Sequence, residues 1–251
     1  MKGDKVMIVV VLPAFNEALC IGDLLNSFCE AINEEGKECR LIVVNDGSSD
    51  ETAAVVSGYQ ERIQLELINH PQNKGLAEAL KTGLFRAVET CSDRDIIVTM
   101  DADNSHLPGL LFRMVRLIRE GNDVVIASRY QSGAKIRGLS MYRRILSYAA
   151  AMLFRTILPM DGVRDYTCGY RAYRASILKR AFQEYGNKFI SEPGFSCMVD
   201  ILIKLRKFDP IVEEAPLILR YDQKKSSSKM NVGKTIRQTL SLLVRRRLGF
   251  D

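Results

Sequence analysis

Short apolar runs alternate with helical patterns through the first half of the chain, and this alternation constrains the fold more than any other feature. Strands are predicted at the apolar runs Met7–Leu12, Leu41–Val44, Ile63–Ile68, Ile96–Met100 and Val124–Ala127. Between them, helical periodicity covers Cys20–Ile32 and Leu76–Val88, and a further helix is expected to begin at Ser48, Ser49 or Asp50. Strands that alternate with helices predict an α/β fold with a mostly parallel central sheet flanked by helices.

Polar residues follow several of these predicted strands, and Asp101-Ala102-Asp103 is the most informative group. It comes directly after the run Ile96–Met100, at the carboxyl end of a strand, where open α/β sheets bind their ligands. Two carboxylates held close together repel each other unless a cation lies between them. A divalent cation with phosphate oxygens is the usual partner, so the sequence predicts a metal–diphosphate site. The alternative is a solvated turn that also caps the next helix.

The second half has a different pattern. We expect a flexible basic loop at Gly133–Gly138, a polar and aromatic segment at Arg164–Arg174, one late strand at Val212–Arg220 and a Lys/Ser loop at Asp222–Lys229. Helices are predicted at Met141–Leu158, Ser196–Leu205 and Val232–Leu248, of which the first and last are amphipathic and carry arginines. Without an internal repeat or a clear linker, residues 1–251 are expected to form one domain. Its first half (1–130) is expected to carry the metal–diphosphate site, and its second half (131–251) to form an acceptor side with a basic C-terminal helix.

Charge and cysteine usage limit the classes of partner. Lysine and arginine number 36 against 30 acidic residues, and the net charge of +6 favours anionic partners such as nucleotides, phosphorylated substrates, anionic lipid headgroups or nucleic acid. The amino terminus has no pattern of a secretion signal, and no run approaches the roughly 20 apolar residues that span a bilayer. The six cysteines have no zinc-ligand spacing and are expected to be buried thiols in a reducing cytoplasm.

Two common nucleotide-binding patterns are missing. The turn after the first strand, Pro13-Ala14-Phe15-Asn16-Glu17, contains no glycine and therefore does not match the dinucleotide-binding pattern GxGxxG. Gly233-Lys234-Thr235 lacks the upstream glycine and strand of a P-loop. Both NAD-dependent redox chemistry and P-loop NTPase chemistry are disfavoured.

Four motifs together resemble the family 2 glycosyltransferases of the GT-A fold. They occur in order at Leu12–Glu17, Val44–Asp50, Asn73–Gly75 and Asp101–Asp103, and the resemblance covers essentially the whole chain. Later segments are most similar to the polyprenyl-phosphate sugar synthases, typified by the dolichol-phosphate mannose synthases. These segments are Ser128-Arg129-Tyr130, Arg143-Arg144 with Ser147, Asp165–Arg171 and the loop Arg220–Lys229.

The resemblance implies a role for each motif on the donor side. It implies that Pro13, Phe15, Glu17, Lys74 and Gly75 line the nucleotide-sugar pocket together with Ala102. Asp46 is expected to accept a hydrogen bond from the base. Asp101 and Asp103 are expected to hold the ribose and Mg²⁺ or Mn²⁺ with the diphosphate. The metal would neutralise charge on the leaving nucleoside diphosphate. Arg220 and Lys229 would close over the donor phosphates.

On the acceptor side, the resemblance implies a polyprenyl phosphate held by cations. Such a phosphate is already anionic and attacks the sugar without a general base. Its candidate ligands are Arg129, Arg143, Arg144 and Ser147, since arginine suits bidentate phosphate contact. Asp165 with Arg129 is a candidate for the catalytic group, and the alternative for Asp165 and Arg171 is a structural ion pair.

The chain departs from the family pattern at several positions. Asn45 replaces the first acid of the usual Asp-Asp-Gly-Ser motif, and Ser105 stands where a glutamine metal ligand is often found. The Arg-to-Lys spacing in the mobile loop is stretched by Gln223–Ser228. The Gln-x-x-Arg-Trp motif of processive polysaccharide synthases is missing, and the chain has no tryptophan.

The resulting hypothesis is inverting, metal-dependent transfer of a hexose from a nucleotide sugar to a polyprenyl or dolichyl phosphate. The donor is expected to be of the GDP-mannose or UDP-glucose type, with UDP-N-acetylhexosamine also open. The location would be the cytoplasmic membrane face, through the amphipathic helices or an anchoring partner subunit, and nucleic acid is not an expected partner.

Three alternatives remain. A saccharide or other hydroxyl acceptor would need Asp165 or Asp200 as general base. A sugar-nucleotide pyrophosphorylase would need a glycine-rich basic loop after the first strand, which this chain lacks. A non-catalytic binding module is the third.

Overall fold

A computed structural model describes residues 6–225 and 241, without the side chains of Arg143 and Arg144. The predicted helix Val232–Leu248 and the predicted site residue Lys229 therefore lie outside the described residues. Among the described residues, no helix is both long enough and apolar enough to cross a bilayer. The strands are β1 (Ile8–Ala14), β2 (Cys39–Asn45), β3 (Leu65–Asn69), β4 (Ile96–Thr99), β5 (Val124–Ser128), β6 (Lys135–Arg137), β7 (Arg171–Arg174), β8 (Val212–Pro216) and β9 (Ile218–Arg220).

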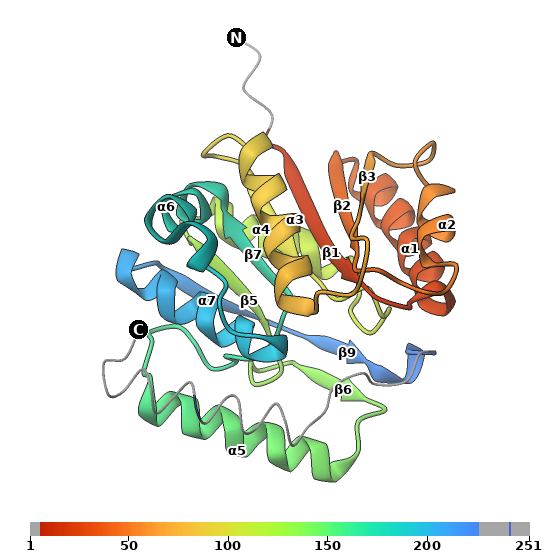
Figure 1. Ribbon diagram of the computed structural model, residues 1–251. Coiled ribbons are helices and arrows are strands. Elements are labelled where there is room, and N and C mark those ends of the chain that lie inside the picture. Colours follow the sequence, from red (N-terminus) through yellow and green to blue (C-terminus); the bar gives the residue numbers. More distant parts are fainter. Residues whose placement is uncertain (1–5, 226–240, 242–251) are drawn as a thin grey trace.

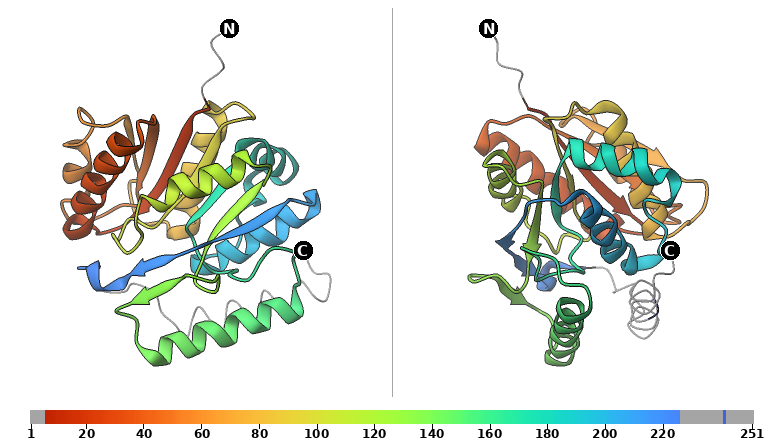
Figure 2. Two further views of the ribbon diagram at one scale, coloured as in Figure 1. Left: turned by 180° about the vertical axis from the view of Figure 1, so that it is seen from behind. Right: turned by 90° about the vertical axis from the view of Figure 1, so that its left-hand side faces the viewer.

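The helices cover both faces of the central sheet (Figures 1 and 2). They are α1 (Ala18–Glu35), α2 (Thr52–Ser57), α3 (Leu76–Thr90), α4 (Leu110–Arg119), α5 (Met141–Ile157), α6 (Ala175–Tyr185) and α7 (Cys197–Leu205). Helices α1, α2 and α4 lie on one face, and α3, α6 and α7 lie on the other. Short 3₁₀ turns occur at Gly186–Lys188, Gly194–Ser196, Arg206–Phe208 and Tyr221–Gln223.

The central sheet has the order β3-β2-β1-β4-β7-β5-β8. Strand β7 runs antiparallel to its neighbours β4 and β5, and the other neighbouring pairs are parallel. Every residue of β4 and β5 is buried, as expected for strands with helices on both faces. The prediction of a mostly parallel α/β sheet is confirmed.

The antiparallel strand β7 matters for function. It begins at Arg171, so the segment that precedes it lies at the same edge as the carboxyl ends of β4 and β5. Asp165 is thereby placed beside Arg129, which follows β5. The sequence predicts only a polar and aromatic segment at Arg164–Arg174 and no strand, because the four residues of β7 include two arginines and show no apolar run.

Two other expectations were wrong in detail. The segment Gly133–Gly138 is not only a loop, because β6 within it pairs in parallel with β9 in a separate two-stranded sheet. The late strand Val212–Arg220 is two strands, since β8 joins the central sheet and β9 belongs to the small sheet.

Helices α4 and α6 were not predicted. Packing on the sheet stabilises both, because α4 buries Leu111, Phe112 and Met114, and α6 buries Ile177 and Leu178.

Helix α5 lies apart from the two helical layers, alongside the small β6–β9 sheet (Figure 1). Its second half is anchored, because Phe154 is fully buried and stacks on Tyr166 with 5.4 Å between ring centroids. Its first half exposes large apolar side chains. These are Met141, Tyr142, Ile145, Tyr148 and, one turn further, Met152, and they are called the α5 apolar stripe below.

The cysteines agree with the prediction of free thiols. All six are free, and five of them are buried. Burial raises the pKa of the Cys39, Cys91, Cys168 and Cys197 thiols to about 12, so these groups stay protonated and unreactive.

Candidate active site

The Asp101–Asp103 turn directly follows β4 and is largely buried. The Asp103 carboxylate is held in place by its own loop: Oδ1 accepts hydrogen bonds from the Ser105 backbone N–H at 3.0 Å and from the Ser105 hydroxyl at 2.6 Å. Ser105 therefore orients Asp103 instead of facing a ligand itself. The other oxygen, Oδ2, is 2.6 Å from the ammonium of Lys224.

Lys224 reaches this turn because the end of β9 is bonded to it. The Arg220 backbone N–H donates to the Ser105 carbonyl at 2.8 Å, and Leu219 forms an antiparallel bridge with His106. Burial alone would raise the pKa of Asp103, but the charges of Lys224 and His106, together with the hydrogen bonds from Lys224 and Ser105, outweigh it, and the pKa is lowered. Sequence reasoning missed Lys224 and named Arg220 and Lys229 in this loop instead. Nothing in the spacing of these basic residues distinguished Lys224.

Asp101 has a different electrostatic environment from Asp103. Burial and, less strongly, the Asp103 charge raise the pKa of Asp101, while His106 acts in the opposite direction. A Cβ atom at Gly169 would lie 3.4 Å from Asp101 Oδ1, so a glycine there keeps this side of the carboxylate uncrowded. A cation between Asp101 and Asp103 would relieve the repulsion between the two carboxylates, which is the smaller of these two causes.

Asp46 anchors the loop that carries Lys74 and Gly75. Its Oδ1 accepts hydrogen bonds from the Lys74 backbone N–H at 2.9 Å and lies 2.7 Å from Nδ1 of His70, and its Oδ2 accepts from the Gly75 backbone N–H at 2.8 Å. Asp46 is almost fully buried. Its predicted contact with a base stays a prediction, and in this structure the carboxylate already has three partners.

The contacts of Asn45 explain why an asparagine stands where the family motif has an aspartate. Its side-chain amide donates to Asn69 Oδ1 at 2.8 Å, and its own Oδ1 accepts the Ser48 backbone N–H at 3.2 Å. An ionised aspartate could accept the second bond but could not donate the first. The amide thus ties the ends of β2 and β3 together.

The turn containing Pro13, Phe15 and Glu17 is joined to the turn after β2. The Asn16 backbone N–H donates to the Ser48 hydroxyl at 2.9 Å, and the Glu17 backbone N–H donates to the Thr52 hydroxyl at 2.8 Å. Glu17 is buried, whereas Pro13 and Phe15 are half-buried. The first two predicted motifs are therefore neighbours in space.

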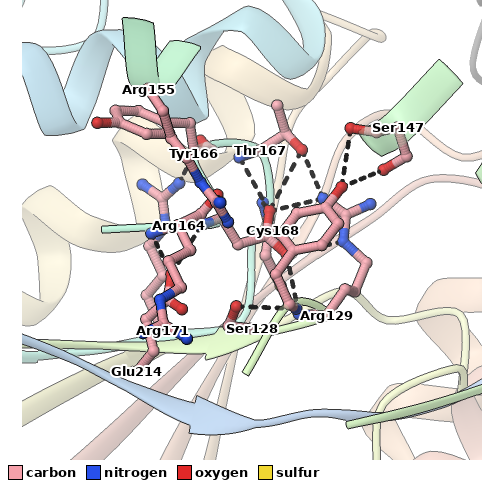
Figure 3. A network of polar contacts seen from close by, with 12 residues as sticks. Ser128, Arg129, Ser147, Arg155, Arg164, Tyr166, Thr167, Cys168, Arg171 and Glu214 are labelled. Atoms are coloured by element: carbon pink, nitrogen blue, oxygen red, sulfur yellow. Dashed lines mark hydrogen bonds and ion pairs between the residues drawn. The ribbon is translucent and has the colours of Figure 1, made fainter. Parts of the chain in front are cut away.

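Arg129 and Asp165 form a bidentate ion pair at the carboxyl end of β5. Figure 3 shows the surrounding polar network, in which Arg129, Thr167 and Glu214 are labelled. Arg129 Nε donates to Asp165 Oδ2 at 2.8 Å, and Nη2 donates to Asp165 Oδ1 at 2.6 Å and to the Thr167 hydroxyl at 2.6 Å. Burial raises the pKa of Asp165, but the Arg129 charge and hydrogen bonds outweigh it, so the pKa is lowered. Asp165 is fully buried and ionised.

The backbone around Asp165 is fixed as well. Glu214 Oε1 accepts the backbone N–H groups of Arg164 at 2.6 Å and Asp165 at 2.7 Å. Arg171 does not pair with Asp165, contrary to the alternative considered above. Its buried guanidinium donates to the carbonyls of Tyr166 and Met198, each at 2.7 Å.

Ser147 lies close to this pair. The Tyr130 hydroxyl bonds to the Ser147 carbonyl at 2.8 Å and to its hydroxyl at 2.7 Å, which ties α5 to the end of β5. A mostly apolar hollow of about 350 Å³ opens here. Its walls are Arg129, Tyr130, Ile136, Leu139, Met141, Ile145, Ser147 and Tyr148.

The remaining predicted phosphate ligands are not all placed. Arg143 and Arg144 lie on α5, but their side chains are outside the described part of the structure. The Arg220 guanidinium pairs with Asp222 at 3.0 Å.

The donor set at the Asp101–Asp103 turn fits a divalent cation, although the described residues contain no ready-made cluster of three or more acidic, histidine or cysteine side chains. The turn has two carboxylates, and Nδ1 of the buried His106 side chain has no hydrogen-bond partner among the described residues. This nitrogen lies 4.0 Å from Asp101 Oδ2. In this structure the ammonium of Lys224 is the cationic partner of the Asp103 carboxylate.

Comparison with known proteins decides the family. Residues 9–182, more than half of the chain, match the model of "Glycosyl transferase family 2". The chain belongs to this family. It is a glycosyltransferase, and the pyrophosphorylase and binding-module alternatives are set aside.

Three curated relatives share a substrate class in their names. A dolichol-phosphate mannosyltransferase of Pyrococcus furiosus is 28% identical over 81% of this chain. A polyprenol monophosphomannose synthase of Mycolicibacterium smegmatis is 26% identical over 92% of this chain and 83% of its own length. An undecaprenyl-phosphate mannosyltransferase of Micrococcus luteus is 27% identical over 90% of this chain and 88% of its own length. The chain spans about half (54%) of the Pyrococcus relative.

Solved structures of a glucosyl-3-phosphoglycerate synthase from Mycobacterium tuberculosis have the same fold. One, with Mn²⁺, UDP-glucose and phosphoglyceric acid, has a TM-score of 0.67 at 21% identity, covering 98% of this chain and 81% of that one. Another, with Mg²⁺ and UDP, has a TM-score of 0.65 at 22% identity, covering 98% of this chain and 80% of that one. The GT-A architecture expected from the sequence is confirmed.

Proposed function

We propose that this glycosyltransferase transfers a hexose from a nucleotide sugar to a polyprenyl phosphate. The observation that carries the proposal is that both carboxylates considered as general bases are committed elsewhere. Asp165 is locked to Arg129, and buried Asp200 accepts hydrogen bonds from the Lys204 ammonium at 2.8 Å and the Ser191 backbone N–H at 2.9 Å. An acceptor that is already anionic needs no such base.

The reaction would be a single displacement. A phosphate oxygen of the acceptor forms the new bond to the anomeric carbon, and the bond from that carbon to the nucleoside diphosphate breaks, so the electron pair leaves with the diphosphate. Attack from the face opposite the leaving group inverts the configuration. The names of the three relatives support mannose as the first sugar to test, with GDP-mannose as its donor.

Asp101 and Asp103 are the residues that would hold Mg²⁺ or Mn²⁺. The metal would stabilise the negative charge that accumulates on the departing diphosphate. Lys224 lies at the same carboxylate and would move its charge to the diphosphate once the metal is bound. The Mn²⁺ and Mg²⁺ complexes of the structural neighbours support a divalent ion in this fold.

The acceptor would enter beside α5. Arg129 forms part of the hollow next to Tyr130 and Ser147, and the same hollow is lined by Ile145 and Tyr148. A cationic group inside an apolar wall suits a phosphate attached to a hydrocarbon chain. The α5 apolar stripe would lie in the interfacial region of a bilayer, where amphipathic helices bind, and would place the protein at the cytoplasmic membrane face, with or without an anchoring partner subunit.

A transfer assay tests this proposal. Purified protein is incubated with Mn²⁺ or Mg²⁺, undecaprenyl or dolichyl phosphate, and radiolabelled GDP-mannose, UDP-glucose or UDP-N-acetylglucosamine. Label extracted into organic solvent, lost with EDTA, is the expected result. Metal-dependent release of nucleoside diphosphate only when saccharides or phosphoglycerate are supplied would contradict the lipid acceptor.

Two variants make the assay specific to the site. Asp103→Ala is expected to reduce transfer by a factor of about 10³ or more with the fold retained, since charge stabilisation at the leaving group is among the largest catalytic contributions. Asp93→Asn is the control. Asp93 is exposed and pairs with Lys179 at the opposite edge of the sheet, so the rate should not change.

A further inference from the structure

His106 occupies an unusual position for a histidine. It lies on the same turn as the two aspartates, is 4% exposed and is held by the backbone bridge to Leu219. Its ring packs near Tyr170, with 5.3 Å between ring centroids. The ring is therefore fixed, and its direction is set by the surrounding backbone and aromatic packing.

The buried ring nitrogen of His106 is not satisfied by the described residues. Nδ1 is shielded from solvent and has no hydrogen-bond partner there, and 4.0 Å to Asp101 Oδ2 is too long for a hydrogen bond. Buried polar atoms are almost always paired, and an unpaired one destabilises the fold. A buried nitrogen without a hydrogen-bond partner, 4.0 Å from a carboxylate oxygen of the Asp101–Asp103 turn, points to a cation as the shared partner of the two groups.

His70, the other histidine of the chain, shows the contrast. Its Nδ1 lies 2.7 Å from Asp46 Oδ1 and its Nε2 lies 3.0 Å from the Thr82 hydroxyl. Both nitrogens of His70 are used, and the ring lies in the Asp46 loop. Of these two histidines, His106 is the one with a ring nitrogen left unpaired by the described residues and close to the Asp101–Asp103 turn.

We propose that His106 Nδ1 is the third protein ligand of the divalent ion held by Asp101 and Asp103. The inference rests on the metal dependence proposed above and deepens it. Ser105 is unsuited to this role, since its hydroxyl donates to Asp103 Oδ1. Imidazole favours transition metals over Mg²⁺, which prefers oxygen ligands, so the site is expected to prefer Mn²⁺ to Mg²⁺.

Pulsed electron paramagnetic resonance of bound Mn²⁺ tests the assignment without a transfer assay. The full chain is prepared with GDP and Mn²⁺, once unlabelled and once with ¹⁵N-histidine. A directly coordinated imidazole gives a ¹⁴N coupling that changes to a ¹⁵N coupling on labelling. Because the chain has two histidines and His70 is engaged elsewhere, a histidine coupling that disappears in a His106 variant assigns the ligand.

Two variants separate ligation from packing. His106→Phe keeps a ring against Tyr170 but offers no ligand atom. Mn²⁺ affinity is expected to fall by at least roughly tenfold, because even the loss of a residue that only supports a metal ligand typically costs that much. His106→Gln offers an amide oxygen. It should restore part of the affinity and shift the Mn²⁺/Mg²⁺ ratio toward Mg²⁺. Thermal melting without metal checks that both variants fold.

The outcomes distinguish this inference from the proposed function. Mn²⁺ binding without a histidine coupling in the wild-type protein, or unchanged Mn²⁺ affinity in His106→Phe, overturns the role of His106 and leaves metal-dependent transfer standing. No Mn²⁺ binding in the presence of GDP or UDP overturns both. The spectrum of the wild-type protein decides the question even if a variant does not fold.

Discussion

The ammonium of Lys224 lies 2.6 Å from Oδ2 of Asp103, although 121 positions separate the two residues in the sequence. Both side chains are nearly buried, with 10% and 12% of their surfaces exposed. Burial lowers the pKa of Lys224, but the charge and the hydrogen bond of Asp103, with smaller contributions from Tyr221 and Glu17, together outweigh it and the pKa is raised, so the lysine is charged at neutral pH. A divalent ion and Lys224 would therefore compete for the same carboxylate.

Lys224→Met is expected to change metal binding and catalysis in opposite directions. Removing the competing cation should tighten Mn²⁺ binding without nucleotide by about tenfold, the equivalent of 1.4 kcal/mol. It should also lower kcat/KM by about tenfold to 100-fold, because a charge near the leaving diphosphate is lost. Calorimetric titration with Mn²⁺ and initial-rate measurements check the two effects.

Lys225→Met is the matched control for this change. Its ammonium pairs at the surface with Asp23, and at least half of each side chain is exposed. Both measurements should match the wild type. Unchanged metal affinity in Lys224→Met would show that the pairing with Asp103 does not oppose metal binding.

Asp165→Asn is expected to destabilise the fold by about 3–5 kcal/mol, since it leaves the largely buried Arg129 guanidinium without its counter-charge. Denaturant unfolding measures the change. Glu184→Gln removes a partner of Lys207 at the surface and should cost less than about 1 kcal/mol. Equal effects of the two substitutions would contradict a special role for the buried pair.

The Arg129–Asp165 pair also predicts a pH dependence of stability. Since the pKa of Asp165 is lowered on folding, its contribution is complete above the usual aspartate value of about 3.9 and is lost as the pH falls through the lower folded value. Wild-type stability should therefore decline below about pH 4, and Asp165→Asn should show a flatter curve there. Unfolding free energies between pH 3 and 6 give the comparison.

Ile145→Glu is expected to weaken membrane binding. Ile145 is 62% exposed at the centre of the α5 apolar stripe, and a carboxylate there would oppose insertion into an anionic interface. Cosedimentation with phosphatidylglycerol vesicles should show a decrease of about tenfold. Leu19→Glu, at an equally exposed leucine on α1, is the control. Equal losses in both variants would argue against α5 as the contact surface.

Gly83→Ala is expected to destabilise the protein by about 1–3 kcal/mol through overpacking. Gly83 lies where α3 crosses the sheet, and an added Cβ would be 2.3 Å from a methyl carbon of Val11 and 3.2 Å from one of Val44. Gly109→Ala at the start of α4 meets open space and should have little effect. Melting temperatures of both variants check the difference.

The sequence by itself determined the central sheet and which polar motifs lie at its carboxyl edge. Continuous apolar runs such as Val9–Leu12 and Ile96–Val98 are buried on both faces, which requires a layer of helices on each side of the sheet. The polar motifs that follow these runs must therefore lie at the edge of the sheet. The order of the motifs also predicted the family, and their turns proved to be neighbours.

Only the tertiary structure decided which side chains meet. Lys224 reaches Asp103 because β9 leaves the central sheet and bonds to the Ser105 turn, a path with no local signal in a Lys/Ser-rich segment. Arg129 meets Asp165 because the short strand β7 runs antiparallel and returns the chain to the carboxyl edge. Local periodicity reports which residues share a strand or helix face, whereas these pairings depend on contacts between segments far apart in the chain.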